Sequence, residues 1–503
     1  MAKVLLGIDN GCTMSKAALF TLEGKELAVA ARKTKTLSPH PGHLERNCEE
    51  LWQATAAAIR EVLAKSRVAP GDIAAAACAG HGNGLYLVDK EGRPVRDAIL
   101  STDSRARDIV DRWLAEGVDR RVRPKTMQSL WAAQPNALLA WLKKHEPETI
   151  RRAGWVLMCK DYVRFRLTGR VAAELTDFSG TSLMDVAAGK FDPAVLEAFG
   201  IGDLAHLLPP LVRSADVCGE VTPGAARDTG LRAGTPVAGG MFDIDACGLA
   251  TGLVDERQIC MIAGTWSCNQ YIATRPVVDD VFMTSCYSIP GYYLMLEGSA
   301  TSASNLEWFV TEFFGAEREQ AAREGRSVYD VTNDLVAATR PDAAPIVFLP
   351  FLYGSHASAD AKAALLGLSG WHTRGDVLRA IYEGVAFSHR WHVERLLQFR
   401  PRPEAICLTG GAARSPVWVR IFADIFQTPI RLPDGTELGA LGGAIAAGVA
   451  AGCFKDFREA VGAMVHVSRT QAPDPSPAGV YEAKYARYKR AVAALDPVWR
   501  SLS

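Results

Sequence analysis

Residues 4–21 read VLLGIDNGCTMSKAALFT: an apolar run, a short polar turn and a second apolar run. Aliphatic and β-branched residues on both sides of Asp-Asn-Gly are typical of two strands joined by a tight turn. A third strand is predicted over residues 26–31 and a helix over residues 49–64, where apolar residues recur at helical spacing. A strand of small residues is predicted over residues 72–78. Strands and helices in this order indicate an α/β fold.

The first turn carries groups that suit a phosphate. Gly11 lets the backbone approach an anion, and Thr13 and Ser15 add hydroxyl donors to the backbone N–H groups. Lys16 adds positive charge, and Asp9 can hold Mg²⁺ directly or through water. The sequence GxxxxGK[ST] is absent, so this is not a Walker loop. A plain hairpin explains the same residues, and such turns are common.

The opening pattern returns near the middle of the chain. Strands are predicted over residues 258–262 and 269–273, with Ala263-Gly264-Thr265 as the turn after the first of them. We interpret this as a faint internal duplication, with a boundary at residues 251–256. Two similar lobes could face one another across a cleft, and a phosphate chain held there would touch both turns. Gly264 and Thr265 are therefore candidates for phosphate binding, although another plain hairpin is the simpler explanation.

Two aspartates follow a predicted strand over residues 236–238, within the segment GGMFDIDACG of residues 239–248. A carboxylate just after a strand end and a glycine pair is well placed to enter a cleft. In phosphoryl transfer to an alcohol, one carboxylate must accept the hydroxyl proton. Asp243 and Asp245 are the candidates, and the alternative is that one or both cap the following helix.

Two more glycine-rich segments lie near the C-terminus. Residues 409–415 follow a predicted strand and precede a helix, which is a common geometry for nucleotide contact and makes Gly410 and Gly411 candidates. Residues 435–444 combine glycine and alanine, so that a helix there can pack closely on its neighbours. Either segment is weak evidence alone, because many turns of α/β proteins share this composition.

Two polar loops near predicted strand ends could hydrogen-bond a polyol. One is the glycine-rich loop with His81 and Asn83, and the other contains Asp103. A lone histidine in such a loop is more often an exposed turn residue. The nearby arginine pair Arg105 and Arg107 is most simply a solvent-facing surface.

Composition excludes several classes of protein. The chain has 503 residues, 48% of them hydrophobic and 22% charged, as in folded globular proteins of two or three domains. Lys+Arg and Asp+Glu both number 56, which disfavours a partner that is a nucleic acid or an anionic membrane. No signal peptide is predicted, and residues 438–453 are too short and too rich in Ala and Gly for a membrane span. The 11 cysteines are scattered without zinc spacing, which indicates free thiols, a cytoplasmic location and no structural metal.

The order of these motifs resembles the FGGY carbohydrate kinases of the actin-like ATPase superfamily, from Asp9 to about Gly452. Residues 141–145, WLKKH, are similar to the first family signature, although Leu138 stands where lysine is usual. Residues 368–384 are similar to the second, although Trp371 replaces an aliphatic residue. The combination is specific even though each piece alone is not.

The resemblance implies two actin-like (ribonuclease H-like) α/β domains facing across a central cleft, residues 1–252 for the sugar and 253–503 for the nucleotide. Its site residues are implied as follows: Asp9 on Mg²⁺; Thr13, Lys16, Gly264 and Thr265 on the phosphates of ATP; Gly410 and Gly411 near adenosine. Our own hypothesis places the sugar against His81, Asn83, Asp103 and Asp243. Two ways of aligning the base motif favour either Asp243 or Asp245, and we expect Asp243. Domain closure and a homodimer are expected from the family alone.

Within the family, residues 84–90, 98–103, 305–309 and 348–355 look like the L-xylulose kinase branch. Ser101 stands where glycerol and D-xylulose kinases usually carry tryptophan, which suggests a more polar or differently oriented substrate. The expected activity is ATP-dependent phosphorylation of the terminal primary hydroxyl of an open-chain ketopentose, with L-xylulose first. D-Xylulose, ribulose and erythritol-type polyols are alternatives, as are a non-catalytic sugar or nucleotide sensor and an actin-like chaperone or filament protein.

Overall fold

The structure is a computed structural model that describes residues 3–279, 281–355, 357–358 and 360–502. The chain forms two compact units that interleave in sequence. The first unit comprises Met1–Val254, Ile272–Met295 and Gly435–His466, and the second comprises Asp255–Tyr271, Leu296–Asp434 and Val467–Ser503. The division expected between residues 252 and 253 stays a prediction, and the return of Gly435–His466 to the first unit was not apparent from the sequence.

The first unit is built on a seven-stranded sheet. Its order is β13-β14-β5-β1-β2-β3, with β15 also paired to β5. β1, β2 and β3 are antiparallel neighbours, whereas β5 runs parallel to β1. The strands are Val4–Asn10 (β1), Met14–Thr21 (β2), Glu26–Lys33 (β3), Ile73–Gly80 (β5), Val217–Glu220 (β13), Pro236–Ala238 (β14) and Met241–Phe242 (β15). The strands predicted over residues 4–8, 16–21, 26–31 and 72–78 are confirmed.

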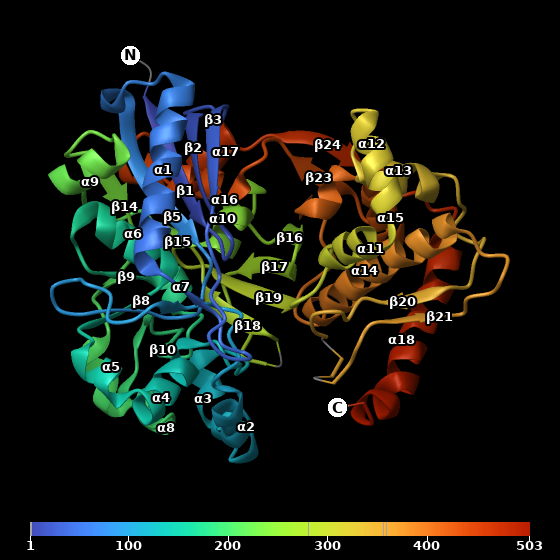
Figure 1. Ribbon diagram of the computed structural model, residues 1–503, viewed down its shortest axis with the longest axis horizontal. Coiled ribbons are helices and arrows are strands. Elements are labelled where there is room, and N and C mark those ends of the chain that lie inside the picture. Colours follow the sequence, from blue (N-terminus) through green and yellow to red (C-terminus); the bar gives the residue numbers. More distant parts are fainter. Residues whose placement is uncertain (1–2, 280, 356, 359, 503) are drawn as a thin grey trace. The chain divides into compact units, whose positions relative to one another are not determined.

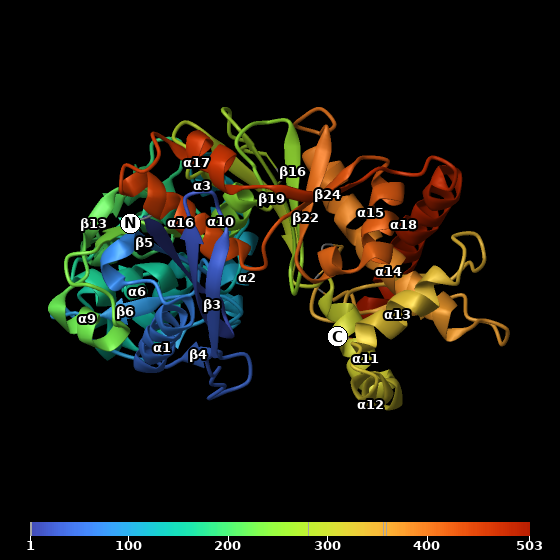
Figure 2. The ribbon, with the colours of Figure 1, turned by 90° about the horizontal axis from the view of Figure 1, so that it is seen from above.

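Helices cover both faces of this sheet (Figures 1 and 2). α1 (Cys48–Ser66) packs on β2 and β3, while α16 (Leu438–Ala450) packs on the opposite face against β1, β5 and α10 (Asp243–Ala250). Asn47 caps α1, because its side chain accepts a hydrogen bond from the Glu50 N–H. The core between α1 and the sheet contains Leu6, Ile8 and Trp52.

α16 lies unusually close to the sheet because neither surface carries bulk. A Cβ at Gly7 would overlap the carbonyl oxygen of Ala440, and a Cβ at Gly442 would overlap the backbone of Ala246. The tightly packed helix predicted over residues 438–453 is therefore confirmed. Among the described residues, no helix is both long and apolar enough to cross a membrane.

Shorter elements complete the first unit. α6 (Cys159–Thr168) packs on β5, and α7 (Leu175–Phe178) contacts β15. A second hydrophobic cluster, which includes Trp113, Leu138 and Phe199, joins helices farther from the sheet. The remaining helices and strands are α2 (Arg107–Ala115), α3 (Val118–Thr126), α4 (Pro135–His145), α5 (Pro147–Arg152), α8 (Pro193–Ala198), α9 (Pro223–Thr229), α17 (Phe457–Met464), β4 (Glu45–Arg46), β6 (Tyr86–Val88), β7 (Ala98–Ile99), β8 (Trp155–Leu157), β9 (Ala173–Glu174), β10 (Met184–Asp185), β11 (Lys190–Phe191) and β12 (Leu211–Val212).

The second unit repeats the local arrangement of the first. β16 (Gln258–Ala263) and β17 (Ser267–Ala273) form an antiparallel hairpin, and β16 runs parallel to β22 (Ala405–Thr409). This matches β1, β2 and β5, and it confirms the strands predicted on each side of Gly264. The full sheet order is β18-β19-β17-β16-β22-β23-β24. By sequence, β18 (Met283–Cys286) and the start of β19 (Tyr293–Ser299) fall in the segment Ile272–Met295 of the first unit. The other elements of the second unit are β20 (Val347–Leu349), β21 (Ala364–Leu366), β23 (Ile430–Pro433), β24 (Val467–Gln471), α11 (Ser304–Phe313), α12 (Gly315–Arg323), α13 (Val328–Ala337), α14 (Arg374–Leu396), α15 (Pro416–Phe426) and α18 (Ala478–Arg500).

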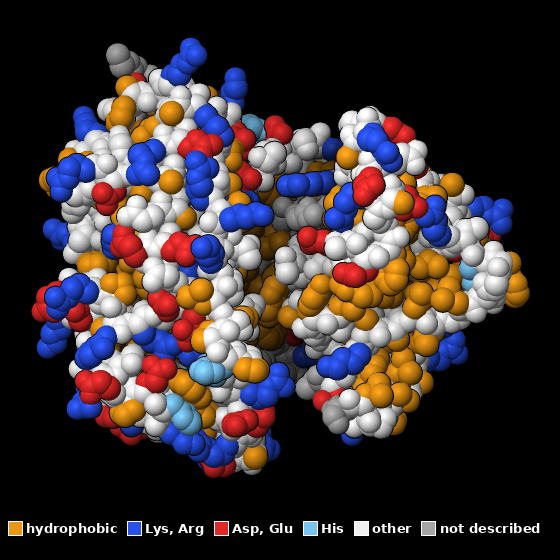
Figure 3. All heavy atoms as spheres, viewed as in Figure 1, with side chains coloured by type: hydrophobic (Ala, Val, Ile, Leu, Met, Phe, Trp, Pro, Cys, Tyr) orange, Lys and Arg blue, Asp and Glu red, His pale blue; other side chains and the backbone are white. Residues whose placement is uncertain are grey.

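Two compositional predictions can be compared with the structure. All the cysteines are free thiols, as expected from their scattered positions. On the face shown in Figure 3, basic and acidic side chains are interspersed and form no continuous basic patch. That face agrees with the formal net charge of zero.

Candidate active site

The first turn joins β1 and β2 and brings Asp9 opposite Lys16 in the antiparallel register. Burial raises the pKa of Asp9 to about 6, and the charge of Lys16 opposes the rise. The start of α16 closes over this carboxylate, because a Cβ at Gly439 would lie 2.5 Å from Asp9 Oδ2. Lys16 Nζ forms an ion pair of 2.7 Å with Glu437, just before the same helix.

The two hydroxyls of this turn differ. Thr13 is exposed, so its side chain is open to a ligand. Ser15 is buried and accepts a hydrogen bond of 2.9 Å from Asn10 Nδ2, which also donates to Thr55. The Ser15 hydroxyl therefore ties β2 to β1 and α1, and its predicted contact with phosphate gains no support from this position.

A buried arginine, Arg46, holds the backbone of the first turn by hydrogen bonds. Its role at the site was not predicted from the sequence. Arg46 is fully buried and its guanidinium donates to the carbonyl oxygens of Gly11 and Cys12. Within the described residues, no carboxylate forms an ion pair with it. A cation without a described carboxylate partner next to the turn favours the binding of anionic groups there.

The two candidate bases are placed differently, although both belong to the first turn of α10. Asp245 is buried, and its Oδ1 accepts hydrogen bonds from Ser288 N (3.1 Å) and Ser288 Oγ (3.3 Å). Asp243 is partly exposed, and its carboxylate accepts a backbone hydrogen bond from Ile244. Burial, then the charges of Asp9 and Asp177, raise the pKa of Asp243 well above its ordinary value. Neither aspartate caps the helix, whose N-cap residue is Phe242.

The predicted sugar residues lie in the same unit but differ in availability. His81 is 4% exposed, so its interpretation as an exposed turn residue is wrong. Burial and the charge of Arg46 lower the pKa of His81 to about 3, so the ring is neutral, and its Nε2 lies 3.2 Å from Tyr86 Oη. Asn83 is buried with φ of 59°, and its Oδ1 has no described hydrogen-bond donor. Asp103 is already engaged by Arg105 and by Leu44 N.

The second-unit candidates form one cluster at the ends of β16 and β22. Gly410 has φ of 89°, and a Cβ there would lie 2.6 Å from the carbonyl carbon of Ala263 and 2.9 Å from Gly264 N. The two glycine turns thus touch through bare backbone. Thr265 and Gly411 are exposed, and Thr265 O accepts a hydrogen bond of 3.2 Å from Ser304 Oγ.

A buried histidine behind this cluster was not predicted. His389 of α14 lies with Nδ1 2.8 Å from Asn269 Oδ1 and Nε2 2.8 Å from Ser302 Oγ. Asn269 belongs to β17, which follows Thr265, and Ser302 precedes α11, whose Ser304 donates to Thr265 O. The His389 side chain therefore connects β17 with the start of α11. Its position inside a long buried stretch of α14 resembles ordinary helix core in the sequence, which is why it was overlooked.

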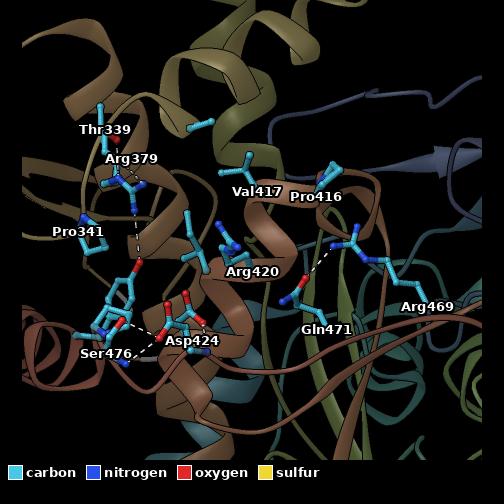
Figure 4. Close-up of a pocket in the computed structure, with 15 residues that line it drawn as sticks. Thr339, Pro341, Arg379, Pro416, Val417, Arg420, Asp424, Arg469, Gln471 and Ser476 are labelled. Carbon is cyan, nitrogen blue, oxygen red and sulfur yellow. Dashed lines mark hydrogen bonds between the residues drawn. The ribbon is translucent and has the colours of Figure 1, made fainter.

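A separate pocket of about 420 Å³ opens in the second unit (Figure 4). Its polar lining is mixed in charge: Arg379, Arg420, Arg469, Asp424 and Asp474. Part of this lining is occupied internally, since Arg379 donates to Thr339 Oγ1 (2.6 Å) and Arg469 to Gln471 (2.7 Å). None of the residues predicted to bind sugar or nucleotide lines this pocket.

Mg²⁺ suits the first unit chemically. Asp9 and Asp243 are two carboxylates close enough for the charge of Asp9 to raise the pKa of Asp243, and no side chain donates a hydrogen bond to either among the described residues. Mg²⁺ characteristically binds through one or two carboxylates, waters and substrate phosphates. The residues present therefore fit the ion.

Sequence comparison identifies relatives over the whole chain. Two models of the FGGY family of carbohydrate kinases match, the N-terminal domain at residues 4–249 and the C-terminal domain at residues 259–451. The chain is 39% identical over 499 residues to the L-xylulose/3-keto-L-gulonate kinase of Escherichia coli K12, covering 99% of this chain and 98% of that protein. It is 28% identical over 516 residues to the erythritol kinase of Brucella abortus, with coverage of 99% and 98%.

Solved structures agree. Xylulose kinase from Rhodospirillum rubrum superposes with a TM-score of 0.85 at 27% identity, covering 99% of this chain and all of that one. Gluconate kinase from Lactobacillus acidophilus gives a TM-score of 0.90 at 22% identity, with complete coverage of both chains. The two family models together match most of the chain, and a relative at 39% identity covers nearly all of it, so the chain belongs to the FGGY family of carbohydrate kinases and has its actin-like ATPase fold.

Proposed function

We propose that this carbohydrate kinase transfers the γ-phosphoryl group of ATP to the terminal primary hydroxyl of an open-chain ketopentose, with L-xylulose as the first candidate. The observation that carries the proposal is Asp243, a partly exposed carboxylate at the start of α10 whose pKa is raised by burial and by the nearby charge of Asp9. The name of the relative at 39% identity supports the choice of sugar.

Asp243 is the proposed base. A partly exposed carboxylate can accept the proton of a substrate hydroxyl, and its raised pKa makes it a stronger base than an ordinary aspartate. Asp245 keeps a structural role, because Ser288 already occupies its Oδ1. Phosphoryl transfer needs chiefly alignment and charge neutralisation, so positioning of these groups supplies most of the catalysis.

ATP is the proposed phosphoryl donor. Thr13 and the backbone of the first turn would contact its phosphates, with Lys16 and Arg46 adding positive charge. Gly264 and Thr265 would contact phosphate in the second unit, and Gly410 and Gly411 would lie near adenosine, where bare backbone allows close approach. Mg²⁺, held by Asp9, would neutralise phosphate charge. A cytoplasmic location and a homodimer remain predictions.

The sugar contacts are proposed for His81 and Asn83, whose loop is buried beside the active-site turn. Asp103 is a weaker candidate because Arg105 and Leu44 N already use both of its oxygens. Ser101 Oγ lies 3.3 Å from Cys12 Sγ. The side chain that replaces the usual tryptophan therefore contacts the first turn, between β1 and β2. This small polar contact is compatible with L-xylulose, D-xylulose, ribulose or erythritol.

A coupled assay of ADP release tests the function, with ATP–Mg²⁺ against L-xylulose, D-xylulose, L- and D-ribulose, erythritol, xylitol, glycerol and 3-keto-L-gulonate. One strongly preferred ketopentose is the expected result. Preference for a tetritol would replace the substrate but keep the kinase. A blank panel with ATP binding intact would contradict the proposed substrates and favour a sensor.

Replacement of each aspartate tests the base. Asp243→Asn should lower kcat by about 10²–10⁴-fold, since a general base contributes about that much, with little change in either KM. Asp245→Asn should mainly lower thermal stability, because it removes acceptors from Ser288. Near wild-type turnover in Asp243→Asn, together with loss of turnover in Asp245→Asn, would reverse the assignment.

A further inference from the structure

Asp177 is a fully buried carboxylate that the mechanism above does not use. It belongs to α7, in the segment ELTDFSG of residues 174–180. Its exposed fraction is zero. The same unit contains the proposed sugar loop and the proposed base.

Asp177 lies between these two parts of the site. A Cβ at Gly82 would be 2.8 Å from Asp177 Oδ1 and would overlap the ring of Phe242. Gly82 is flanked by His81 and Asn83, and Phe242 precedes Asp243. The carboxylate therefore faces the backbone of the sugar loop at its centre and the ring next to the base.

Both oxygens of this carboxylate lack a hydrogen-bond donor among the described residues. Lys160 Nζ lies 3.4 Å from Oδ2, an ion pair without hydrogen-bond geometry. Lys160 is shared, since it lies closer to Asp161 at 3.0 Å and also reaches Glu174 at 3.5 Å. Two cations, Lys160 and Arg164, thus serve three buried carboxylates.

Asp177 is the least satisfied of the three carboxylates. Glu174 accepts hydrogen bonds from Thr176 Oγ1 (2.7 Å) and Ser214 Oγ (2.8 Å). Asp161 Oδ1 pairs with Arg164 at 2.8 Å as well as with Lys160. A buried acceptor left without donors costs free energy, so such a group in a folded protein calls for a functional explanation.

The adjacent loop has the same deficit. Asn83 Oδ1 is buried and also lacks a described donor. The carboxylate of Asp177 and the Oδ1 atom of Asn83 are thus both acceptors without a described donor, and a ligand that satisfies these oxygens must bring hydrogen-bond donors. Hydroxyl groups of a sugar do so, whereas the carboxylate of a sugar acid would add a further negative charge beside Asp177 and Asp243.

We propose that Asp177 is a further sugar-binding residue, which accepts hydrogen bonds from hydroxyl groups of an uncharged polyhydroxyl substrate. The inference rests on the proposed function, because it assigns a role within the same sugar site. It makes the site selective for a neutral ketose or polyol over the corresponding sugar acid.

Steady-state kinetics of Asp177→Asn with the preferred sugar test this role. KM for the sugar should rise about 10- to 100-fold, the range for losing a charged partner of a substrate hydroxyl, while KM for ATP stays within about twofold. Asp161→Asn is the matched control, since it also removes a carboxylate partner of Lys160. Unlike Asp177, however, the wild-type Asp161 carboxylate is already paired closely with Lys160 and Arg164. Asp161→Asn should lower the melting temperature and leave KM for the sugar unchanged.

Mono-deoxy analogues of the preferred sugar sharpen the test. One analogue, lacking the hydroxyl that Asp177 binds, should lose affinity in the wild type and lose no more in Asp177→Asn, because the two changes remove one interaction. Equal and independent losses for every analogue would overturn the proposal, as would an unchanged KM in Asp177→Asn or an equal rise in Asp161→Asn.

The wild-type enzyme provides a measurement that does not depend on a folded variant. Its kcat/KM should be at least about tenfold higher for the neutral ketose than for the corresponding sugar acid. A preference for the acid would overturn the inference. Failure of the proposed function itself looks different, because the wild type would then phosphorylate no sugar at all.

Discussion

At the residue scale, the site depends on which carboxylates remain unengaged. Asp177 has no described hydrogen-bond donor and Asp243 is partly exposed, whereas Asp245, Asp103 and Glu174 are occupied by internal side-chain or backbone donors. Like charges buried close together raise one another's pKa, and this is the arrangement around Asp243. The carboxylates of the first unit that are available to a substrate are therefore the few that internal donors do not occupy.

The dependence of activity on pH follows from that arrangement. Asp243 must be ionised to act as a base, so kcat/KM for the sugar should fall as the pH drops through its raised pKa. The acid limb should lie above pH 4, the ordinary range of aspartate being about 3.9. Removal of one neighbouring charge in Asp177→Asn should move this limb to lower pH. An acid limb at the ordinary aspartate range would contradict the assignment of the base.

At the element scale, hydrogen bonds hold the strand end that carries the base. Thr176 Oγ1 donates to Glu174 Oε2 at 2.7 Å and accepts from Phe242 N at 3.0 Å. Arg164 Nη1 donates to Gly239 O at 2.5 Å, at the other end of the same segment. α6 and α7 thus fix β15 and the first residue of α10.

Thr176→Val should break this link with almost no change in volume. Kcat should fall about tenfold with both KM values nearly constant, because only the alignment of the base changes, and the loss of hydrogen bonds should cost about 1–3 kcal/mol of stability. Thr181→Val is the control, since its hydroxyl donates only to the Phe178 carbonyl. Equal kinetic losses in the two variants would show that general destabilisation, and not alignment, is responsible.

The glycine turns of the second unit form the other element that can be tested. Gly410→Ala introduces a Cβ 2.6 Å from backbone at a φ of 89°, so the turn must shift. KM for ATP should rise at least about tenfold, a loss of roughly 1.4 kcal/mol or more, while KM for the sugar changes little. Gly370→Ala, which meets no atom within 4 Å, should leave both unchanged. An unaltered KM for ATP in Gly410→Ala would remove Gly410 from the nucleotide site.

At the scale of the whole molecule, sequence order and compact units do not coincide. α16 follows nearly all of the second unit in sequence, yet it covers β1 and β5 of the first. The close approach between Gly7 and Ala440 leaves a flat apolar surface on the sheet once α16 is removed.

A fragment of residues 1–252 should therefore be insoluble or partly unfolded, although it contains the whole first family-model match. Addition of residues 435–466 through a short linker should restore a cooperative thermal transition, because α16 then covers the sheet again. Circular dichroism melts of both fragments provide the measurement. A stable, cooperative fragment of residues 1–252 would show that α16 is dispensable for the first unit.

Local sequence patterns predicted many of the strands, turns and helices of this protein. The hairpins around Asp9 and Gly264 pair segments that are neighbours in the chain, and the strands before Asp243 and Gly410 and the packed helix after residue 437 are marked by their local composition. Turn composition and apolar periodicity reflect such short-range interactions directly. The same motifs, taken in order, also indicated the family.

Tertiary structure alone decided which of these groups can act. Ser288 donates to Asp245 from 43 residues away, Asn10 and Thr55 donate to Ser15, and Lys160 of α6 forms an ion pair with Asp177 of α7. Whether a carboxylate is a base, a structural tie or a sugar ligand depends on the donors and charges that folding brings to it. Those donors come from distant parts of the chain, and composition and periodicity carry no record of their positions.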